Sequence, residues 1–293
     1  MTAPALLLIA HGTRDPRGAE EMDTLLALLR ERHDAPVDAG WLEDFADPSP
    51  AEAADRLVAA GATHVVTVPF LNVGAGHAKT DVPEHLAEVR SAHPDLRVDH
   101  ARVLGLHPAL FALARERVDA VSDPAGRADE VLLVAASGSS DPDANGDLAK
   151  AARFLAETTG HRWVDHCFSG VTWPTTDEAL RRLAAAGAQR VVLFSWSLLA
   201  GLLERRVTDA AAAVSAETGI EVVDAGRFGP DVRVAEAVLD RYHEVLDGDP
   251  RMNCDLCQYR MPLPGREDRA GSPSAGGTGE RVGHLPLGVS PRG

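Results

Sequence analysis

The sequence predicts an α/β protein that consists of two doubly wound, parallel-sheet domains and a C-terminal tail. The prediction rests on two observations. A shift of 126 residues superposes motifs of the first half of the chain on motifs of the second, and apolar runs alternate with helical patterns in both halves. Strands that are apolar along their whole length are typical of parallel sheets covered on both faces.

The repeat begins with a strand and the polar motif that follows it. The run LLLIA precedes HGTRDP at 11–16, and the run LLVAA precedes SGSSDP at 137–142. Farther along, a helix opens in each half with the spacing of a capping box, at Ser49/Glu52 and Thr175/Glu178. Both helices end in Ala-Gly-Ala before a valine-rich strand, and one offset accounts for all of these matches. We therefore infer an internal duplication.

The predicted elements follow one order twice. In the first half we expect strands near 4–10, 36–42, 63–70 and 97–104 and helices near 17–32, 50–60, 81–93 and 108–121. In the second half we expect strands near 130–136, 162–168, 189–196 and 220–225. The domains are expected at 1–125 and 126–247. The remaining segment, 248–293, holds a Cys-x-x-Cys pair and then a stretch rich in Gly, Pro, Ser and Arg, which is typical of a disordered tail.

The composition excludes several classes of partner. Of 293 residues, 45% are hydrophobic and 25% are charged, but the net charge is −15. An acidic chain without a basic run is not expected to bind nucleic acid or an anionic membrane. No apolar run reaches the ~18 residues of a membrane span. The apolar N-terminus lacks a basic segment and continues into a polar motif, so we interpret it as a strand rather than a signal peptide and expect a cytoplasmic protein.

Two of the twelve histidines stand out by their positions. His11 directly follows the first strand, and His77 ends the NVGAGH segment after the third. Ligands of open α/β sheets bind beyond the carboxyl ends of the strands, and adjacent glycines let the backbone approach a flat ligand. If the two strands are neighbours, both imidazoles face one site. Glu43 and Asp44 follow the second strand, where they can attract a cation, but we favour an ordinary solvated role for them.

Other classes of site lack their motifs. The segment Gly74-Ala75-Gly76 is not followed by the third glycine of a dinucleotide fingerprint. The chain has neither a Gly-Lys-Ser/Thr phosphate loop nor a Gly-x-Ser-x-Gly nucleophile elbow. His85, four residues after Asp81, is expected to be a surface residue rather than part of a second metal-binding face.

Taken together, the motifs resemble those of the class II chelatases, which insert a divalent metal into a tetrapyrrole. The first strand runs into AHGTRDP, the third is followed by PFL, Gly76-His77 and DVP, and LGLHP lies at 104–108. The segment MNCDLCQYR at 252–260, with PLPG behind it, is similar to the tail of long-form sirohydrochlorin cobaltochelatases. In that family the tail carries an iron–sulfur cluster. The resemblance covers about residues 4–271.

The resemblance implies an active site between two like domains, with His11 and His77 as catalytic residues and metal ligands. Ser137 and Leu203 stand at the equivalent positions of the second half, so only the first half is expected to carry the metal chemistry. Metal insertion displaces two pyrrole protons. A neutral imidazole, with an unperturbed pKa of about 6.5, can bind a metal or accept a proton near neutrality. Imidazole suits Co2+ and Fe2+ alike, so the histidines do not choose between them.

The implied substrate, sirohydrochlorin, is a polycarboxylate, so an acidic protein must bind it through local cations or backbone donors. Arg14 and Lys79 lie near the histidines in sequence and are candidates to pair with its carboxylates. Solvated surface charge is an equal alternative for both. His107 is a candidate either for substrate contact or for indirect support of the site.

The cysteines suggest a second prosthetic feature. Cys254 and Cys257 supply two thiolates, whereas Cys167 falls at the end of a buried strand and is expected to be a small core residue. A 2Fe-2S or 4Fe-4S cluster takes four protein ligands, so we expect a homodimer in which each subunit gives two thiolates to a shared cluster. A cluster with a non-cysteine ligand, a cluster that uses Cys167, and a simple dithiol are the alternatives.

The sequence thus favours a sirohydrochlorin chelatase that inserts cobalt in cobalamin biosynthesis, with iron insertion in siroheme biosynthesis as the alternative. A different class of function stays open: a non-enzymatic carrier of metal or tetrapyrrole, or a redox-responsive Cys-x-x-Cys protein.

Overall fold

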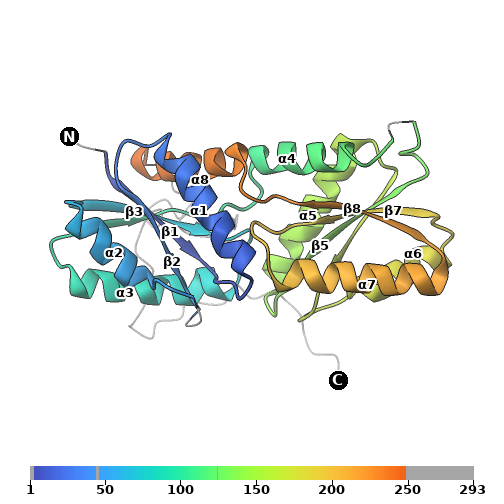
Figure 1. The fold of residues 1–293 in the computed structure, drawn as a ribbon, viewed down its shortest axis with the longest axis horizontal. Helices are drawn as coiled ribbons and strands as arrows, with labels where there is room; N and C mark the ends of the chain where they lie inside the picture. Colours follow the sequence, from blue (N-terminus) through green and yellow to red (C-terminus); the bar gives the residue numbers. More distant parts are fainter. Residues whose placement is uncertain (1–2, 44–45, 124, 249–293) are drawn as a thin grey trace, which may run out of the picture. The chain divides into compact units, whose positions relative to one another are not determined.

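The computed structural model describes residues 3–43, 46–123 and 125–248, which form two four-stranded sheets (Figure 1). The strand orders are β2-β1-β3-β4 and β6-β5-β7-β8. All neighbouring strands pair in parallel, and the order is the same in both sheets. The predicted duplication of a doubly wound α/β unit is therefore confirmed. The Cys-x-x-Cys segment and the predicted tail lie outside the described residues.

The elements follow the predicted order. The first half contains β1 (Ala5–Ala10), α1 (Pro16–Arg30), β2 (Val37–Trp41), α2 (Pro50–Ala59), β3 (His64–Phe70), a π-helical turn η1 (His77–Asp81), α3 (Val82–Ala92), β4 (Arg97–His100) and α4 (Pro108–Asp119). The second contains β5 (Val131–Ala136), α5 (Pro142–Thr159), β6 (Trp163–Phe168), α6 (Thr176–Ala185), β7 (Arg190–Ser195), α7 (Leu202–Thr218), β8 (Glu221–Arg227) and α8 (Val232–Leu246). Strand β4 is shorter than predicted, and η1 was not anticipated. None of the described helices is long and apolar enough to cross a membrane.

Local sequence signals explain where the repeated helices begin and end. At the start of α2, the Ser49 hydroxyl accepts the N–H of Glu52 at 3.2 Å, and the Glu52 carboxylate accepts the N–H of Ser49 at 2.8 Å. Gly61 follows the C-cap residue of α2 and has φ +92°, and its counterpart Gly187 after α6 has φ +95°. Glycine adopts this left-handed conformation without the steric cost of a Cβ, which lets the chain turn into the next strand.

Each sheet is covered on both faces. Along β1, Leu6 and Leu8 point into the core shared with α1, whereas Leu7 and Ile9 point to the face covered by α2 and α3. This alternation follows from the two-residue period of a strand. Helices α6 and α7 cover the corresponding face of the second sheet with a separate apolar cluster. A parallel sheet buried in this way explains why β1, β3 and β5 contain no Asp, Glu, Lys or Arg.

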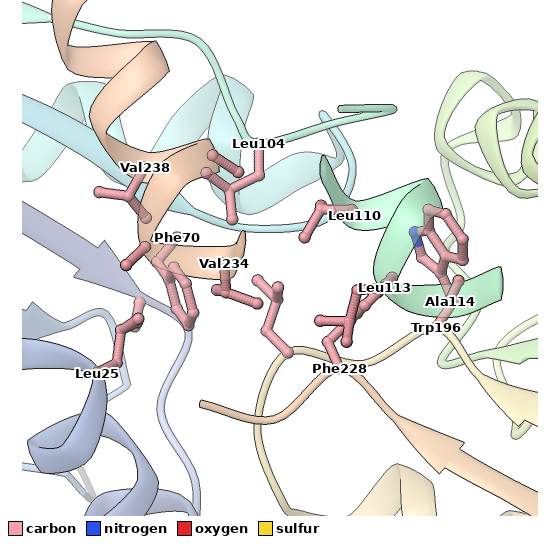
Figure 2. Close-up of a cluster of buried hydrophobic side chains, with 14 of the residues drawn as sticks. Leu25, Phe70, Leu104, Leu110, Leu113, Ala114, Trp196, Phe228, Val234 and Val238 are labelled. Atoms are coloured by element: carbon pink, nitrogen blue, oxygen red, sulfur yellow. The ribbon is translucent and has the colours of Figure 1, made fainter. Parts of the chain in front are cut away.

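The last helix of each sequence half packs on the sheet of the other half. Helix α8 packs against α1 and β3, while α4 packs against α5, β7 and β8 (Figure 1). Figure 2 shows Val238 of α8 beside Phe70 of β3, and Leu113 of α4 near Phe228, which follows β8. The apolar core is consequently continuous between the two halves. The predicted division at 1–125 and 126–247 follows the repeat but does not include this exchange of helices.

Candidate metal site

The sheet order brings three loops of the first half together. Because β1 lies between β2 and β3, the segments that follow these strands meet at one edge of the sheet. His11 follows β1, Glu43 follows β2, and His77 opens the turn η1 after β3. The backbone N–H of Glu43 donates to the carbonyl of His11 at 3.1 Å, which fixes two of these loops to each other. The fold therefore brings the two predicted histidines next to each other.

The three side chains converge with a spacing suited to one cation. Glu43 Oε1 lies 3.7 Å from His11 Nε2 and 3.9 Å from His77 Nε2. The two imidazole rings are 4.4 Å apart between centroids and nearly perpendicular, at 85°. The three ligand atoms all lie within 4.8 Å of one another. Metal–nitrogen bonds of about 2.0–2.1 Å place neighbouring ligands roughly 3–3.5 Å apart, so a small contraction closes the group around a divalent ion.

Both histidines have the tautomer that metal binding requires. His77 Nδ1 lies 2.5 Å from Asp81 Oδ2, and His11 Nδ1 lies 3.2 Å from the carbonyl oxygen of Gly12. A carbonyl or carboxylate oxygen accepts a hydrogen bond, so Nδ1 is the donor in each ring and Nε2 keeps its lone pair. Partners on the far nitrogen also hold a metal-ligating imidazole in orientation. The two lone pairs therefore face the position beside Glu43.

The turn η1 sets the direction of His77. Its wide π-helical winding places the carboxylate of Asp81 against the imidazole four residues earlier, and the hydroxyl of Thr80 donates to the Gly76 carbonyl at 2.6 Å. Single π-helical turns occur often at functional sites. Neither histidine is deeply buried: the side chains of His11 and His77 are 50% and 35% exposed, so a solvated cation can reach them.

Glu43 is the site residue that the sequence analysis undervalued. We expected it to be a solvated surface charge, whereas the structure places its carboxylate between the two histidines. Its signal was its position directly after β2, which becomes informative once β2 is known to adjoin β1. Asp44 lies outside the described residues. His85 contacts Glu88 at 3.2 Å rather than Asp81, in agreement with its expected surface role.

The second half lacks this group. Ser137 and Leu203 stand where His11 and His77 would recur, and Ser169 stands in place of Glu43. Among the described residues, His11, Glu43 and His77 form the one group of metal-binding side chains in which all ligand atoms converge. The pseudo-symmetric fold therefore carries an asymmetric site.

The predicted substrate-binding cations lie next to this site. Arg14 is exposed in the loop between His11 and helix α1. Lys79 lies within η1, and its Nζ bonds to Asp141 Oδ2 at 2.6 Å and to Asp143 Oδ2 at 3.3 Å, both at the start of α5. This pairing raises the pKa of Lys79 and lowers that of Asp141. Lys79 thus joins the metal-binding turn to the second half.

His107 has a different position from the other candidates. Its buried imidazole caps α4, with Nδ1 accepting the N–H of Ala109 at 3.2 Å, and its Nε2 lies 3.1 Å from Asp240 Oδ2 on α8. Burial lowers the pKa of His107, and the nearby Arg241 adds to this effect. These contacts join the two exchanged helices, and they favour indirect support of the site over direct contact with a substrate.

Of the three cysteines, Cys167 lies among the described residues. Cys167 is fully buried in β6 beside Thr176, and burial raises the pKa of its thiol to about 12. A thiol with such a pKa stays protonated at neutral pH, as expected for a core residue. Cys254 and Cys257 lie outside the described residues.

The carboxyl edges of the two sheets contact each other around the metal-binding group. Thr13, two residues after His11, donates its hydroxyl to the carbonyl of Ala200 at 3.1 Å. Asn72, which follows β3, donates to the carbonyl of Trp196 at 2.8 Å. Loops that follow β1 and β3 therefore meet loops that follow β5 and β7, and the second half provides surface opposite the histidines.

Fold and site define a class: a duplicated α/β protein with a group of two histidines and one carboxylate in one half that could hold a metal ion. The chain belongs to the CbiX family, whose sequence profile matches residues 5–121 and again residues 131–245. The two matches begin at positions separated by the offset of the repeat.

Several curated relatives and solved structures are similar to this chain. A sirohydrochlorin cobaltochelatase of Priestia megaterium is 33% identical over 266 residues, which cover 88% of this chain and 85% of the relative. A sirohydrochlorin ferrochelatase of Bacillus subtilis is 27% identical over 203 residues, covering 69% and 77% of the two chains. The solved structure of SirB from Bacillus subtilis with Fe3+ has a TM-score of 0.75 at 24% identity and covers 85% of this chain and 99% of that chain. This likeness confirms the two-domain fold.

Proposed function

We propose that the protein is a sirohydrochlorin chelatase, a lyase that inserts a divalent metal into the tetrapyrrole, with Co2+ as the favoured metal. The observation that carries the proposal is the convergence of His11, His77 and Glu43 on one cation position. The family and the two kinds of chelatase among the relatives support it, and the relative that is 33% identical over 88% of this chain is a cobaltochelatase.

The residue types fit the steps that insertion requires. The Nε2 atoms of His11 and His77 and the carboxylate of Glu43 take the incoming cation from water, since imidazole and carboxylate both bind first-row divalent metals. Three protein ligands leave further coordination positions open for the pyrrole nitrogens. The metal can then pass from protein ligands to macrocycle ligands one bond at a time.

The same residues can receive the displaced protons. Two N–H protons leave the macrocycle as one M2+ enters, so charge is conserved when both protons pass to bases. A histidine that has released the metal has a free Nε2 lone pair beside the macrocycle, and Asp81 stabilises the imidazolium that forms on His77. Glu43 is a second acceptor at 3.7–3.9 Å from both rings.

Arg14 and Lys79 are proposed partners of the substrate carboxylates. Both flank the metal-binding group, Arg14 after His11 and Lys79 after His77. For Lys79 a substrate carboxylate must compete with Asp141 and Asp143, so substrate binding would loosen this link to the second half. For His107 we propose indirect support through its contact with Asp240.

Insertion by the purified protein tests the function. Sirohydrochlorin is mixed with Co2+, Fe2+ or Ni2+ under anaerobic conditions, and the absorbance change on metal insertion is followed with and without protein. We expect the largest acceleration with Co2+. Faster insertion of Fe2+ would assign the protein to siroheme synthesis, which is the second candidate because ferrochelatases are among its relatives. Tight tetrapyrrole binding without acceleration by any metal would favour a carrier instead.

We further propose that Cys254 and Cys257 bind an iron–sulfur cluster shared by two subunits of a homodimer. The spacing of the pair supports this, and the buried, protonated Cys167 is unsuited to supply a third thiolate. Iron and sulfide analysis combined with sedimentation is the test. We expect a dimer with one cluster, and Cys254→Ser with Cys257→Ser should lose both iron and dimerisation. A monomer that keeps a full cluster would contradict sharing, and a redox-active dithiol without iron would contradict the cluster. The reduced thiolates that this proposal needs are consistent with a cytoplasmic protein.

A further inference from the structure

Large apolar side chains are exposed at the carboxyl edge of the second sheet. Trp173 is 76% exposed and Val171 is 75% exposed, both in the loop between β6 and α6. Leu202, the first residue of α7, is 60% exposed. These positions correspond to the loops that carry Glu43 and His77 in the first half. Exposed apolar side chains that gather at one functional edge indicate a binding surface.

The loop between β6 and α6 holds one of these side chains in an unusual conformation. Val171 has φ +67°, the one positive value among the described residues other than glycine, and the N–H of Thr172 donates to the carbonyl of Gly170 at 2.7 Å across it. A tight turn of this kind is rare, and a β-branched residue in it is strained. Strain of this kind is found at ligand-contacting loops, and here it accompanies an apolar side chain that is exposed to solvent.

Two links place this surface opposite the metal-binding group. Thr13, two residues after His11, bonds to Ala200, two residues before Leu202. Lys79, two residues after His77, bonds to Asp141 in the segment that follows β5. In that same segment, Gly138 approaches the Gly170 carbonyl so closely that a Cβ on Gly138 would lie 2.3 Å from that oxygen.

The positively charged side chain of Arg206 lies beside the loop that carries two of these apolar side chains. The guanidinium of Arg206 lies close to Gly170, next to the Val171 turn. A Cβ built on Gly170 would lie 3.6 Å from Arg206 Nη1. Arg206 is exposed, and no carboxylate in the described part of the chain forms an ion pair with it. Its neighbour Arg205, by contrast, is paired with Asp15 at 2.9 Å. The unpaired guanidinium is therefore available to a carboxylate from outside the protein.

We propose that Trp173, Val171, Leu202 and Arg206 form the substrate-binding wall for the tetrapyrrole, with the apolar side chains against the flat macrocycle and Arg206 on one of its carboxylates. The inference rests on the proposed function and names the residues that select its substrate. A flat aromatic ring system bearing carboxylates matches both parts of this wall. A second copy of the chain is the alternative occupant, and the state of association of the Trp173 variant distinguishes it from the tetrapyrrole.

The first test replaces the arginine side chain. Arg206→Gln is compared with Arg162→Gln, which removes an exposed arginine from the amino end of β6 in the same half. Binding of sirohydrochlorin without metal is measured by titration, and KM and kcat are measured in the insertion assay. We expect Arg206→Gln to weaken binding and raise KM about fivefold to tenfold with little change in kcat, because a charge-assisted bond to one substrate group is lost. Arg206→Lys should recover part of the affinity, and Arg162→Gln should behave as wild type.

The second test uses the tryptophan. Trp173→Ala is compared with Trp163→Ala, which removes a 39% exposed tryptophan at the start of β6. Because the macrocycle loses an aromatic stacking partner, Trp173→Ala should weaken sirohydrochlorin binding about tenfold. It should also remove most of the quenching of tryptophan fluorescence by the bound macrocycle. Co2+ binding in the absence of tetrapyrrole should be unchanged in both variants.

The outcomes separate this inference from the function itself. In one outcome, wild-type protein binds sirohydrochlorin, Arg206→Gln and Trp173→Ala bind it more weakly as expected, and no metal insertion is accelerated. The substrate-binding wall is then supported and the chelatase function is wrong. If wild-type protein inserts metal and the two variants match their controls in KM and quenching, the wall is wrong and the function stands. Dimerisation that is lost in Trp173→Ala while sirohydrochlorin binding is kept would also overturn the proposal.

Discussion

His11, Glu43 and His77 are each fixed in a different way. His77 is held by a carboxylate four residues later, His11 by the carbonyl of Gly12, and Glu43 by the short segment that joins it to β2. The rings meet edge to face, at 85°, and thereby direct both Nε2 atoms toward the Glu43 carboxylate. Such preorganisation lowers the cost of assembling the ligands when the cation arrives.

The first residue-scale prediction concerns Glu43. Glu43→Gln removes the anionic ligand but keeps its size, so the affinity for Co2+ without tetrapyrrole should fall about tenfold or more, since a charged ligand is replaced by a neutral one. Titration calorimetry measures this directly. Glu20→Gln, an exposed substitution on α1, is the matched control and should bind as wild type. Unchanged affinity in Glu43→Gln would show that the carboxylate is not a ligand.

A second prediction concerns the carboxylate behind His77. Asp81→Asn keeps the shape of the side chain but weakens its hold on Nδ1–H, and loss of such supporting contacts typically lowers metal affinity about 10–100-fold. Because an amide does not stabilise an imidazolium, kcat for insertion should fall as well. Asp95→Asn, exposed before β4, serves as the control. Equal metal affinity and kcat in the two variants would remove Asp81 from the account.

The histidines were predictable from sequence, whereas Glu43 was not ranked correctly. His11 and His77 each follow an apolar strand beside glycines, which is a local signal. Glu43 also follows a strand, but a single charged residue in a loop is ordinary. The local sequence does not show that its strand, β2, pairs with β1. The pairing of Lys79 with Asp141 joins residues 62 positions apart, and no local pattern predicts it.

At the scale of elements, local patterns predicted most of the fold. Strands and helices were placed within a few residues because apolar periodicity and capping residues are local properties. The turn η1 escaped prediction, since the same residues satisfy an ordinary helical pattern. The element that carries His77 is thus the one whose winding departs from the α-helix.

Strand β4 supports a prediction about pH. His100 at its end is half-buried and lies 2.9 Å from the Thr67 hydroxyl, and burial, with help from Arg90, lowers the pKa of His100 to about 4. In the unfolded chain the pKa is about 6.5, so the unfolded state binds more protons between these values. Stability is then fully present above pH ~6.5 and is lost as the pH falls toward 4.

Urea unfolding between pH 4.5 and 7.5 measures this effect. The free energy of unfolding should decrease by roughly 2 kcal/mol on acidification because of His100, at about 1.4 kcal/mol per pKa unit. Burial also lowers the pKa values of His33, His107 and His161, and these groups change stability in the same direction. His100→Gln should flatten the pH profile. A profile as steep as that of the wild type would show that His100 is not protonated on unfolding.

At the scale of the whole molecule, the exchange of α4 and α8 joins the two halves. Helix α8 contributes Val234, Val238 and Tyr242 to the continuous core, and the Tyr242 hydroxyl donates to the Pro4 carbonyl at 2.8 Å. The sequence repeat predicted two domains but not this exchange. Each helix carries an apolar face, but the local sequence does not say which of two similar sheets that face covers.

The exchange predicts cooperative unfolding. Because the last helix of each half packs on the sheet of the other, the described region should unfold as one unit, with equal calorimetric and van't Hoff enthalpies. The fragment 1–125, which follows the sequence boundary, lacks α8 and leaves Leu25, Leu29 and Phe70 uncovered on that side. We expect it not to fold alone. Two separate transitions in calorimetry, or a folded 1–125 fragment, would contradict this view of the molecule.

We expect metal insertion to depend on the histidine pair of the first half alone. The most direct test of this expectation is the initial rate of Co2+ insertion into sirohydrochlorin by His11→Ala with His77→Ala, beside a control that carries His85→Ala with His243→Ala. We expect the first variant to fall to the rate without protein while the control keeps the wild-type rate. If the variant without His11 and His77 inserts Co2+ as fast as the wild type, the assignment of the site is wrong.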